Sequence, residues 1–156
     1  MANNLYVTAV EERSGKSAII LGVMQMILKE IGRVAFFRPI IHDHVFGRTD
    51  HDLNLMLKYF KLDIEYNDMH AYTLSQARQL ISSGQEEILY ENILKKYHQL
   101  ASKYDFVLCE GTDFHGKEPG FELDLNANIA LTIGAPMLLI FSGRDKTTEE
   151  ICTHTA

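Results

Sequence analysis

The chain has 156 residues, of which 46% are hydrophobic and 23% charged, a balance typical of a single globular domain with one core. Its net charge of −6 at pH 7 offers no basic face to a phosphate backbone, which argues against nucleic acid as a partner. A single nucleotide is not excluded, because a loop of backbone amides and one lysine are enough to bind it.

The N-terminal residues and the cysteines indicate the compartment. The chain does not open with a basic region followed by an apolar stretch, so it does not read as a signal peptide. The apolar stretch 18–28 is interrupted by Gly22 and Gln25 and is too short to span a bilayer. The two cysteines, Cys109 and Cys152, are too few and too far apart for a disulfide framework or a zinc cluster. We therefore expect a cytoplasmic protein without a membrane partner.

The first part of the chain predicts a strand, a helix and a second strand. Residues 5–10 form a β-branched and apolar run that ends in a polar cluster. Residues 16–31 follow as a helix that is apolar on almost every face, with Gly32 as its C-terminal stop. Residues 33–41 are again apolar and contain Pro39, which cannot donate to a central ladder. Uninterrupted apolar strands joined by a helix indicate a parallel sheet covered on both faces.

The rest of the chain alternates helices and strands in the same way. The expected helices cover residues 51–60, 73–81, 85–104 and 122–133, and the expected strands cover residues 105–109 and 136–141. Asp50 or Asp52 is available to cap the first of these helices. Thr73 and Gln76 have the spacing of a capping box at the start of the second.

The end of the chain predicts one more element. Thr147 and Glu150 have the spacing of a capping box, so a new helix is starting where the sequence stops at Ala156. Four strands and a helix that has barely begun make an incomplete doubly wound fold. We therefore expect a single three-layer α/β domain over residues 1–156, with a mostly parallel sheet and a truncated C-terminus.

The segment between the first strand and the first helix has the composition of a phosphate-binding loop. Gly15 lets the backbone approach a phosphate, Lys16 supplies positive charge, and Ser17 can hold Mg²⁺. The pattern G-x-x-x-x-G-K-[ST] fails at its first position, where Val10 stands. The alternative is an ordinary helix N-terminus, in which Ser14 caps the helix and Lys16 is solvated. The position directly after a first strand favours a P-loop NTPase-like domain.

Acidic residues after the later strands are candidates for a metal site. Glu110 ends the third strand at the carboxyl edge of the sheet, beside the loop after the first strand. An acid at this place holds Mg²⁺ through water or polarises the attacking group; the alternative is an ordinary strand-end carboxylate. Asp50 and Asp52 follow the second strand at the same edge, and either completes a metal site with Ser17 and Glu110, while helix capping alone explains the other. We favour Asp50 as the ligand. The predicted metal ligands are Ser17, Asp50 and Glu110, and the predicted nucleotide-binding residues are Glu12, Arg13, Ser14, Gly15, Lys16, Ser17, Arg38 and Glu110.

Two other groups of residues invite a functional interpretation that we do not favour. His42, Asp43, His44 and His51 suggest a transition-metal site, but only a loop holds them and no cysteine lies nearby. We expect them to be loop residues near the phosphate site, where a protonated histidine favours an anion. Cys109 lies within an apolar strand, and strand alternation points it away from Glu110, so we expect a buried structural thiol.

Several segments resemble a known family. NLYVTAVEERSGKSAIILGVMQ followed by GRVAFFRPI resembles the dethiobiotin synthetase-like domain. ISSGQEEILYENILKKYHQLASKYDFVLCEGTDF and ELDLNANIALTIGAPMLLIFSGRDKT are similar, in order and spacing, to the N-terminal domain of long bacterial phosphate acetyltransferases. The resemblance implies a P-loop fold shared with dethiobiotin synthetase and cobyrinic acid amide synthases. It also implies that Gly15, Lys16 and Ser17 match the phosphate loop, Glu110 the acid after the third strand, and Asp50 the metal-side aspartate.

The resemblance further implies a role within a larger enzyme. In the family, this domain precedes a middle domain and a catalytic domain that moves an acetyl group between coenzyme A and phosphate. The first hypothesis is therefore a regulatory domain that binds ATP, another nucleotide or a metabolic effector, together with the other domains of its chain and in a homo-oligomer. The second is an ATP- and Mg²⁺-dependent carboxylate ligase of the dethiobiotin synthetase class. The third is a structural domain whose phosphate loop is a remnant and which holds subunits together.

Overall fold

The computed structural model describes residues 3–11, 14–43, 47, 49–113 and 119–155. At its centre lies a four-stranded sheet in the order β2-β5-β1-β6, in which all neighbouring strands are parallel. The strands are β1 (Asn3–Ala9), β2 (Val34–Phe37), β5 (Phe106–Glu110) and β6 (Met137–Ile140). The predicted α/β class and mostly parallel sheet are confirmed.

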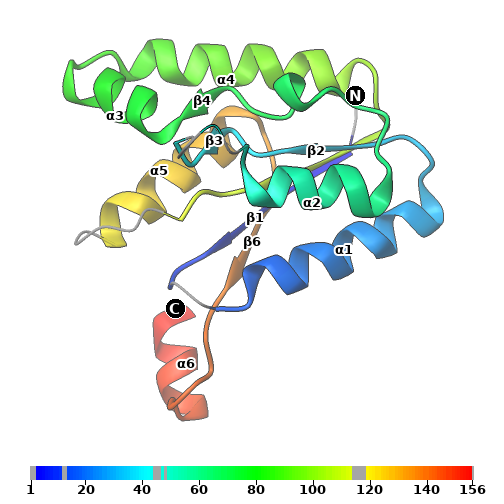
Figure 1. Cartoon of the computed structure of the whole chain (residues 1–156). Coiled ribbons are helices and arrows are strands. Elements are labelled where there is room, and N and C mark those ends of the chain that lie inside the picture. Colours follow the sequence, from blue (N-terminus) through cyan, green and yellow to red (C-terminus); the bar gives the residue numbers. More distant parts are fainter. Residues whose placement is uncertain (1–2, 12–13, 44–46, 48, 114–118, 156) are drawn as a thin grey trace.

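Helices cover both faces of this sheet (Figure 1). They are α1 (Lys16–Glu30), α2 (His51–Phe60), α3 (Leu74–Ser82), α4 (Glu86–Ala101) and α5 (Pro119–Thr132), with a 3-10 turn η1 (Tyr66–Asp68) after α2. The last helix, α6 (Thr148–Thr155), lies beyond the end of β6 (Figure 1). On one face, side chains of α3, α4 and α5 pack with alternate strand residues such as Val107. On the other face, Ile20 and Met24 of α1 and Leu53 of α2 pack with Leu108. The predicted three-layer architecture is confirmed.

The apolar run expected as one strand over residues 33–41 is divided in two. The first part is β2, which lies in the main sheet and ends at Phe37. The second part is β3 (Ile40–Ile41), which pairs in parallel with β4 (Tyr72–Thr73) in a separate two-stranded sheet. The expectation of one continuous strand was therefore wrong. The physical reason lies at Arg38 and Pro39, because the Arg38 amide donates to Met69 and Pro39 has no amide to donate to the ladder.

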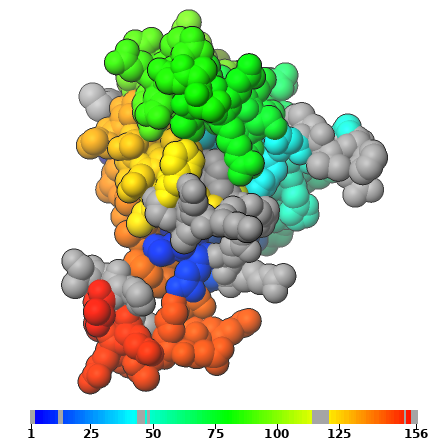
Figure 2. Space-filling view, turned by 90° about the vertical axis from the view of Figure 1, so that its left-hand side faces the viewer, coloured from blue at the N-terminus to red at the C-terminus, as the bar shows by residue number. Residues whose placement is uncertain are grey.

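The predicted helix starts agree with the cap geometry. The Thr73 side chain accepts from the amide of Gln76, and the Gln76 side chain accepts from the amide of Thr73, so the capping box is formed. The same reciprocal bonds join Thr147 and Glu150 before α6. Figure 2 shows α3 and α4, in green, at one end of the molecule and the segment after β6, in red, at the other. Across the residues that the structure describes, none of the helices has the length and apolar character needed to cross a membrane.

Candidate functional site

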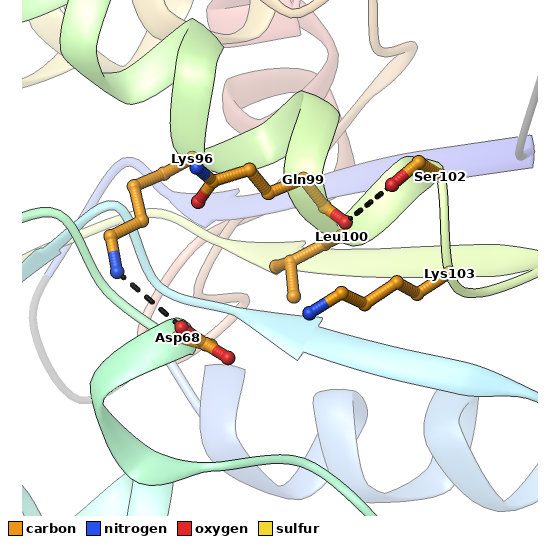
Figure 3. Close-up of a pocket in the computed structure, with 6 residues that line it drawn as sticks. All are labelled: Asp68, Lys96, Gln99, Leu100, Ser102 and Lys103. Atoms are coloured by element: carbon orange, nitrogen blue, oxygen red, sulfur yellow. Dashed lines mark hydrogen bonds and ion pairs between the residues drawn. The ribbon is translucent and has the colours of Figure 1, made fainter.

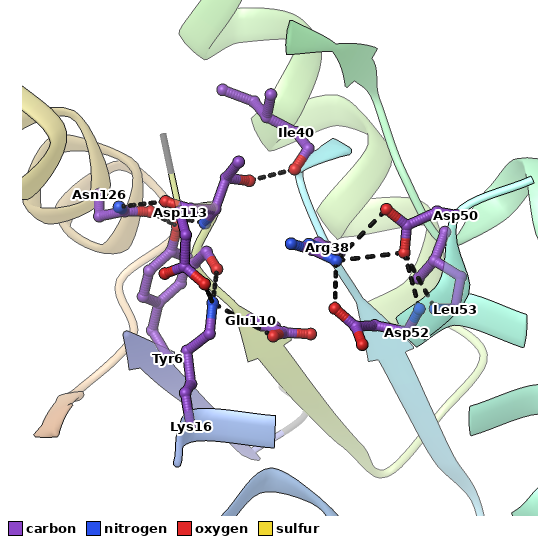
Figure 4. A network of polar contacts seen from close by, with 12 residues as sticks. Tyr6, Lys16, Arg38, Ile40, Asp50, Asp52, Leu53, Glu110, Asp113 and Asn126 are labelled. Carbon is purple, nitrogen blue, oxygen red and sulfur yellow. Dashed lines mark hydrogen bonds and ion pairs between the residues drawn. The ribbon is translucent and has the colours of Figure 1, made fainter. Parts of the chain in front are cut away.

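Lys16 lies where the carboxyl ends of the two central strands meet. Gly15 precedes α1 with a φ of +84°, a left-handed conformation that glycine adopts without strain. This turn directs the Lys16 side chain across the end of the neighbouring strand β5 (Figure 4). Its Nζ donates to the carbonyl of Gly111 at 2.6 Å and forms ion pairs with Asp113 Oδ2 at 2.9 Å and Glu110 Oε1 at 3.2 Å. With 5% of its surface exposed, Lys16 is buried, and its helix is capped by Gly15 without a side-chain bond. The alternative of a Ser14 cap with a solvated lysine is therefore wrong.

Glu110 is the last residue of β5 and is 1% exposed. Burial raises the pKa of its carboxyl group, and the positive charges of Arg38 and Lys16 partly oppose this rise. Its Oε1 contacts the Lys16 amine, yet it has no hydrogen bond of good geometry with any residue the structure describes. We regard the contact as an ion pair rather than a hydrogen bond. A buried acidic oxygen without a hydrogen bond suits Mg²⁺ or a water bound to it.

Arg38 forms a second buried charge cluster beside Glu110 (Figure 4). Its Nη1 donates to Asp50 Oδ1 at 3.1 Å, to Asp50 Oδ2 at 3.3 Å and to Asp52 Oδ2 at 2.6 Å. Burial alone would lower the pKa of Arg38, but the carboxylates of Glu110, Asp50 and Asp52 outweigh it and raise the pKa. Arg38 Nε is buried and has no hydrogen-bond partner among the residues described. The structure thus places Arg38 and Glu110 in one electrostatic cluster.

The three predicted metal ligands differ in whether their oxygen atoms already form hydrogen bonds within the protein. Asp50 Oδ1 caps α2 by accepting from the amides of Asp52 and Leu53, both at 3.1 Å, in addition to its bonds with Arg38. The capping role of Asp50 is confirmed, and both of its oxygens are engaged. Ser17 is exposed in the first turn of α1. Mg²⁺ binding by Ser17, Asp50 and Glu110 stays a prediction, for which Glu110 provides the available oxygen.

A buried hydrogen-bond network supports the end of β5. The hydroxyl of Tyr6 donates to Asn126 Oδ1 at 2.8 Å, and the amide of Thr112 donates to the same oxygen at 3.2 Å. Asn126 Nδ2 donates back to the carbonyl of Thr112 at 3.1 Å. Gly111 lies so close to this network that a Cβ on it would lie 2.6 Å from Thr8 Oγ1 and 2.7 Å from Asn126 Oδ1. These contacts fix the backbone that carries the acceptors of Lys16.

Sequence reasoning missed Asp113, Tyr6 and Asn126. The signal for Asn126 is weak, because the polar residues Asp124 and Asn128 flank it in α5, although Asn126 is the buried and hydrogen-bonded one. No comparable signal distinguishes Asp113 from the other polar residues that follow β5.

The remaining candidate site residues are those just before Ser14 and the histidines after β3. Glu12, Arg13 and His44 lie outside the described residues. Glu11, which directly precedes Glu12, forms an ion pair with Lys146, a residue of the segment after β6. His42 and His51 line a hollow of about 230 Å³ together with Arg38 and Asp50. Within the described part of the chain, no group of three or more His, Cys, Asp or Glu side chains is arranged to hold a metal ion.

Cys109 is fully buried among apolar side chains, as predicted. Burial raises the pKa of its thiol, so the reactive thiolate is disfavoured. The prediction of a structural thiol is confirmed.

A second hollow, of about 370 Å³, lies between η1 and the C-terminal part of α4 (Figure 3). It is lined by Lys96 of α4, by Lys103 in the turn after α4 and by Asp68 of η1. The Lys96 amine is 3.6 Å from Asp68 Oδ1 and donates to the carbonyl of Asn67 at 2.7 Å. None of the predicted site residues lines this hollow.

Comparison with known proteins identifies the type of domain. A family model described as an AAA domain matches residues 3–156. The chain belongs to this family. The AAA domain is 52% identical to a phosphate acetyltransferase of Nitratidesulfovibrio vulgaris over 99% of this chain and 22% of that protein. It is 43% identical to a phosphate acetyltransferase of a Synechocystis species over 90% of this chain and 20% of that protein.

The similarity also extends to more distant proteins. A phosphate acetyltransferase of Haemophilus influenzae is 22% identical over 97% of this chain and 21% of that protein. The AAA domain thus spans roughly a fifth of the length of each of these relatives. The resemblance to the N-terminal domain of long phosphate acetyltransferases is confirmed.

Proposed function

We propose that this AAA domain is a regulatory, nucleotide- or effector-binding part of a phosphate acetyltransferase, and that another part of the same protein transfers the acetyl group. The relatives support the parent enzyme, because all three of those named above are phosphate acetyltransferases. Each is about five times longer than the matched segment, which leaves ample chain for a separate catalytic part. We further propose that the domain contacts the rest of its chain and contributes to a homo-oligomer.

The observation that carries the proposal is the position of Lys16. Its amine lies at the N-terminus of the 15-residue helix α1, at the edge of the sheet where β1 and β5 end. The N-terminus of a helix carries a partial positive charge and unpaired amides, and both favour an anion. A lysine held there supports the binding of a phosphate or carboxylate group.

Regulation fits the site better than turnover does. The first glycine of the phosphate-loop pattern is absent, since Val10 stands in its place. Lys16 is already bound by three internal acceptors, and a catalytic lysine must instead follow a transferring phosphoryl group. The ligase alternative rests on the Lys16–Glu110 pair, and it predicts phosphate release from ATP that Lys16→Ala abolishes.

A direct titration tests the proposed function. ATP, GTP and NADH are titrated separately into the full-length protein that contains this chain, and heat of binding is measured. We expect at least one to bind, and Lys16→Ala to weaken that binding about tenfold or more, as loss of a charged contact does. Lys95→Ala is the matched control, because Lys95 is an exposed lysine on α4. Failure of all three ligands to bind contradicts the proposal.

One observation favours the third hypothesis, in which the phosphate loop is a remnant and the domain only holds subunits together. The internal contacts of Lys16 join the loop after β1 to the end of β5, as a purely structural lysine would. It predicts that Lys16→Ala leaves every effector response unchanged, while deletion of the domain breaks the oligomer. The effector response of Lys16→Ala distinguishes the two, because both predict that deletion of the domain alters the oligomer seen by light scattering.

A further inference from the structure

Three oxygen atoms of the protein surround the amine of Lys16, one as a hydrogen-bond acceptor and two as ion-pair partners. An ammonium group carries three N–H donors. The three oxygen atoms are the carbonyl of Gly111 at 2.6 Å, Asp113 Oδ2 at 2.9 Å and Glu110 Oε1 at 3.2 Å. An anionic ligand therefore reaches Lys16 only by replacing one of them.

Burial indicates which acceptor is replaced. The Glu110 side chain is 1% exposed and is enclosed at the end of β5. The Gly111 carbonyl belongs to a backbone that is tied by its amide to Val7 at 2.8 Å and packed against Thr8. The Asp113 side chain is 33% exposed and lies beyond the end of the strand. Of the three, Asp113 leaves with the smallest disturbance.

The backbone next to Asp113 is held independently of its carboxylate. Thr112 exchanges two hydrogen bonds with Asn126, and its hydroxyl donates to the carbonyl of Ile40. A rotation of the Asp113 side chain is therefore enough to free Lys16, with no movement of the buried network.

We infer that Asp113 is an internal competitor, whose carboxylate occupies the position of the ligand's anionic group and leaves Lys16 when the ligand binds. This inference rests on the proposed function. The group that replaces a carboxylate beside an ammonium is another oxyanion, so the ligand presents a phosphate or a carboxylate to Lys16.

The competition weakens the apparent affinity for ligand. When only a fraction of molecules has a free Lys16, the apparent dissociation constant rises by the inverse of that fraction. We expect the partly exposed contact with Asp113 to leave Lys16 free in about one of ten molecules. Removing the charge of Asp113 is thus expected to tighten binding about tenfold.

Titration of pyrophosphate and of ATP into the full-length protein tests the inference. The variants are Asp113→Asn and Asp113→Ala, and urea unfolding establishes that each is folded. Asp124→Asn is the control, because Asp124 is exposed on α5 and its loss changes the net charge equally. We expect both Asp113 variants to bind pyrophosphate or ATP about tenfold more tightly than the wild type, and Asp124→Asn to bind within twofold of it.

The outcomes separate the inference from the proposed function. Binding by the wild type that is equal or weaker in both Asp113 variants overturns the inference and leaves the proposed function standing. Tightening of equal size in Asp124→Asn also overturns it, since net charge alone then explains the effect. Absence of pyrophosphate and ATP binding in the wild type and in both Asp113 variants overturns the inference, and the proposed function is then decided by the titrations of GTP and NADH. Binding detected in the Asp113 variants alone supports the inference, because the carboxylate of Asp113 then keeps the ligand away from Lys16 in the wild type.

Discussion

The Lys16 amine lies 3.2 Å from the Glu110 carboxylate, and both side chains are almost completely buried. The pair joins the first turn of α1 to the last residue of β5. Because β1 and β5 are parallel neighbours, with Val7 opposite Glu110, the loop after β1 lies directly beside this carboxylate.

Breaking this pair is expected to destabilise the fold. Lys16→Met leaves Glu110 buried beside one fewer cation and is expected to lower the free energy of unfolding by about 3 kcal/mol. The double variant Lys16→Met with Glu110→Gln is expected to lose less than the sum of the single variants, since the two residues interact. Urea unfolding of all three measures the coupling, and additive losses would show that the residues do not interact energetically. Lys95→Met at the exposed surface of α4 serves as a control.

The buried carboxyl group of Glu110 predicts a pH dependence. Because burial raises its pKa in the folded protein above the unfolded value, the folded state binds more protons between those two pKa values. Stability is therefore fully present below the unfolded pKa and decreases as pH rises through the folded pKa. Urea unfolding at a series of pH values from 4 upward, for the wild type and Glu110→Gln, measures this. The wild type is expected to lose stability relative to the variant as pH rises, and parallel curves would contradict the assignment.

Gly111 is expected to tolerate no side chain. A Cβ there would lie 2.6 Å from Thr8 Oγ1 and 2.7 Å from Asn126 Oδ1, so Gly111→Ala is expected to lower the free energy of unfolding by about 1–3 kcal/mol. Gly22→Ala is the matched control. Gly22 lies inside α1 with no atom within 4 Å of a Cβ, and the same change there is expected to stabilise the protein by about 0.5–1 kcal/mol. Equal effects at both positions would rule out a steric cause.

Asp50 combines a helix cap with an ion pair, and two substitutions separate these roles. Asp50→Asn keeps an acceptor oxygen for the amides of Asp52 and Leu53 but removes the charge opposite Arg38. Asp50→Ala removes both and is expected to be less stable than Asp50→Asn by about 1 kcal/mol, the typical contribution of an N-cap. Thermal unfolding measures the difference. Identical stability of the two variants would show that the cap makes no net contribution.

Much of the fold follows from local patterns in the sequence. The apolar runs around Val7, Phe36 and Leu108 predicted parallel strands, since strands buried on both faces lack polar alternation. The pairing of Thr73 with Gln76 predicted a helix start, because the capping box involves residues only three apart. The proximity of Lys16 and Glu110 was predictable too, because the carboxyl ends of parallel strands share one edge.

Features that depend on tertiary contacts were not predictable. The division of the second apolar run after Phe37 depends on the Arg38 amide, which donates to the carbonyl of Met69, a residue far along the chain. The two-residue strand β4 is too short to leave a period in the sequence. The contact of Asp113 with Lys16 joins the loop after β5 to α1, and no local pattern encodes it.

The effector response of acetyl transfer tests the central claim most directly. Acetyl transfer between coenzyme A and phosphate by the full-length protein is measured across a series of ATP, GTP and NADH concentrations, for the wild type and Lys16→Ala. The account predicts that at least one of these ligands changes the rate in the wild type and that the change is lost or shifted about tenfold in concentration in the variant. A response of the same size and midpoint in both proteins would contradict it.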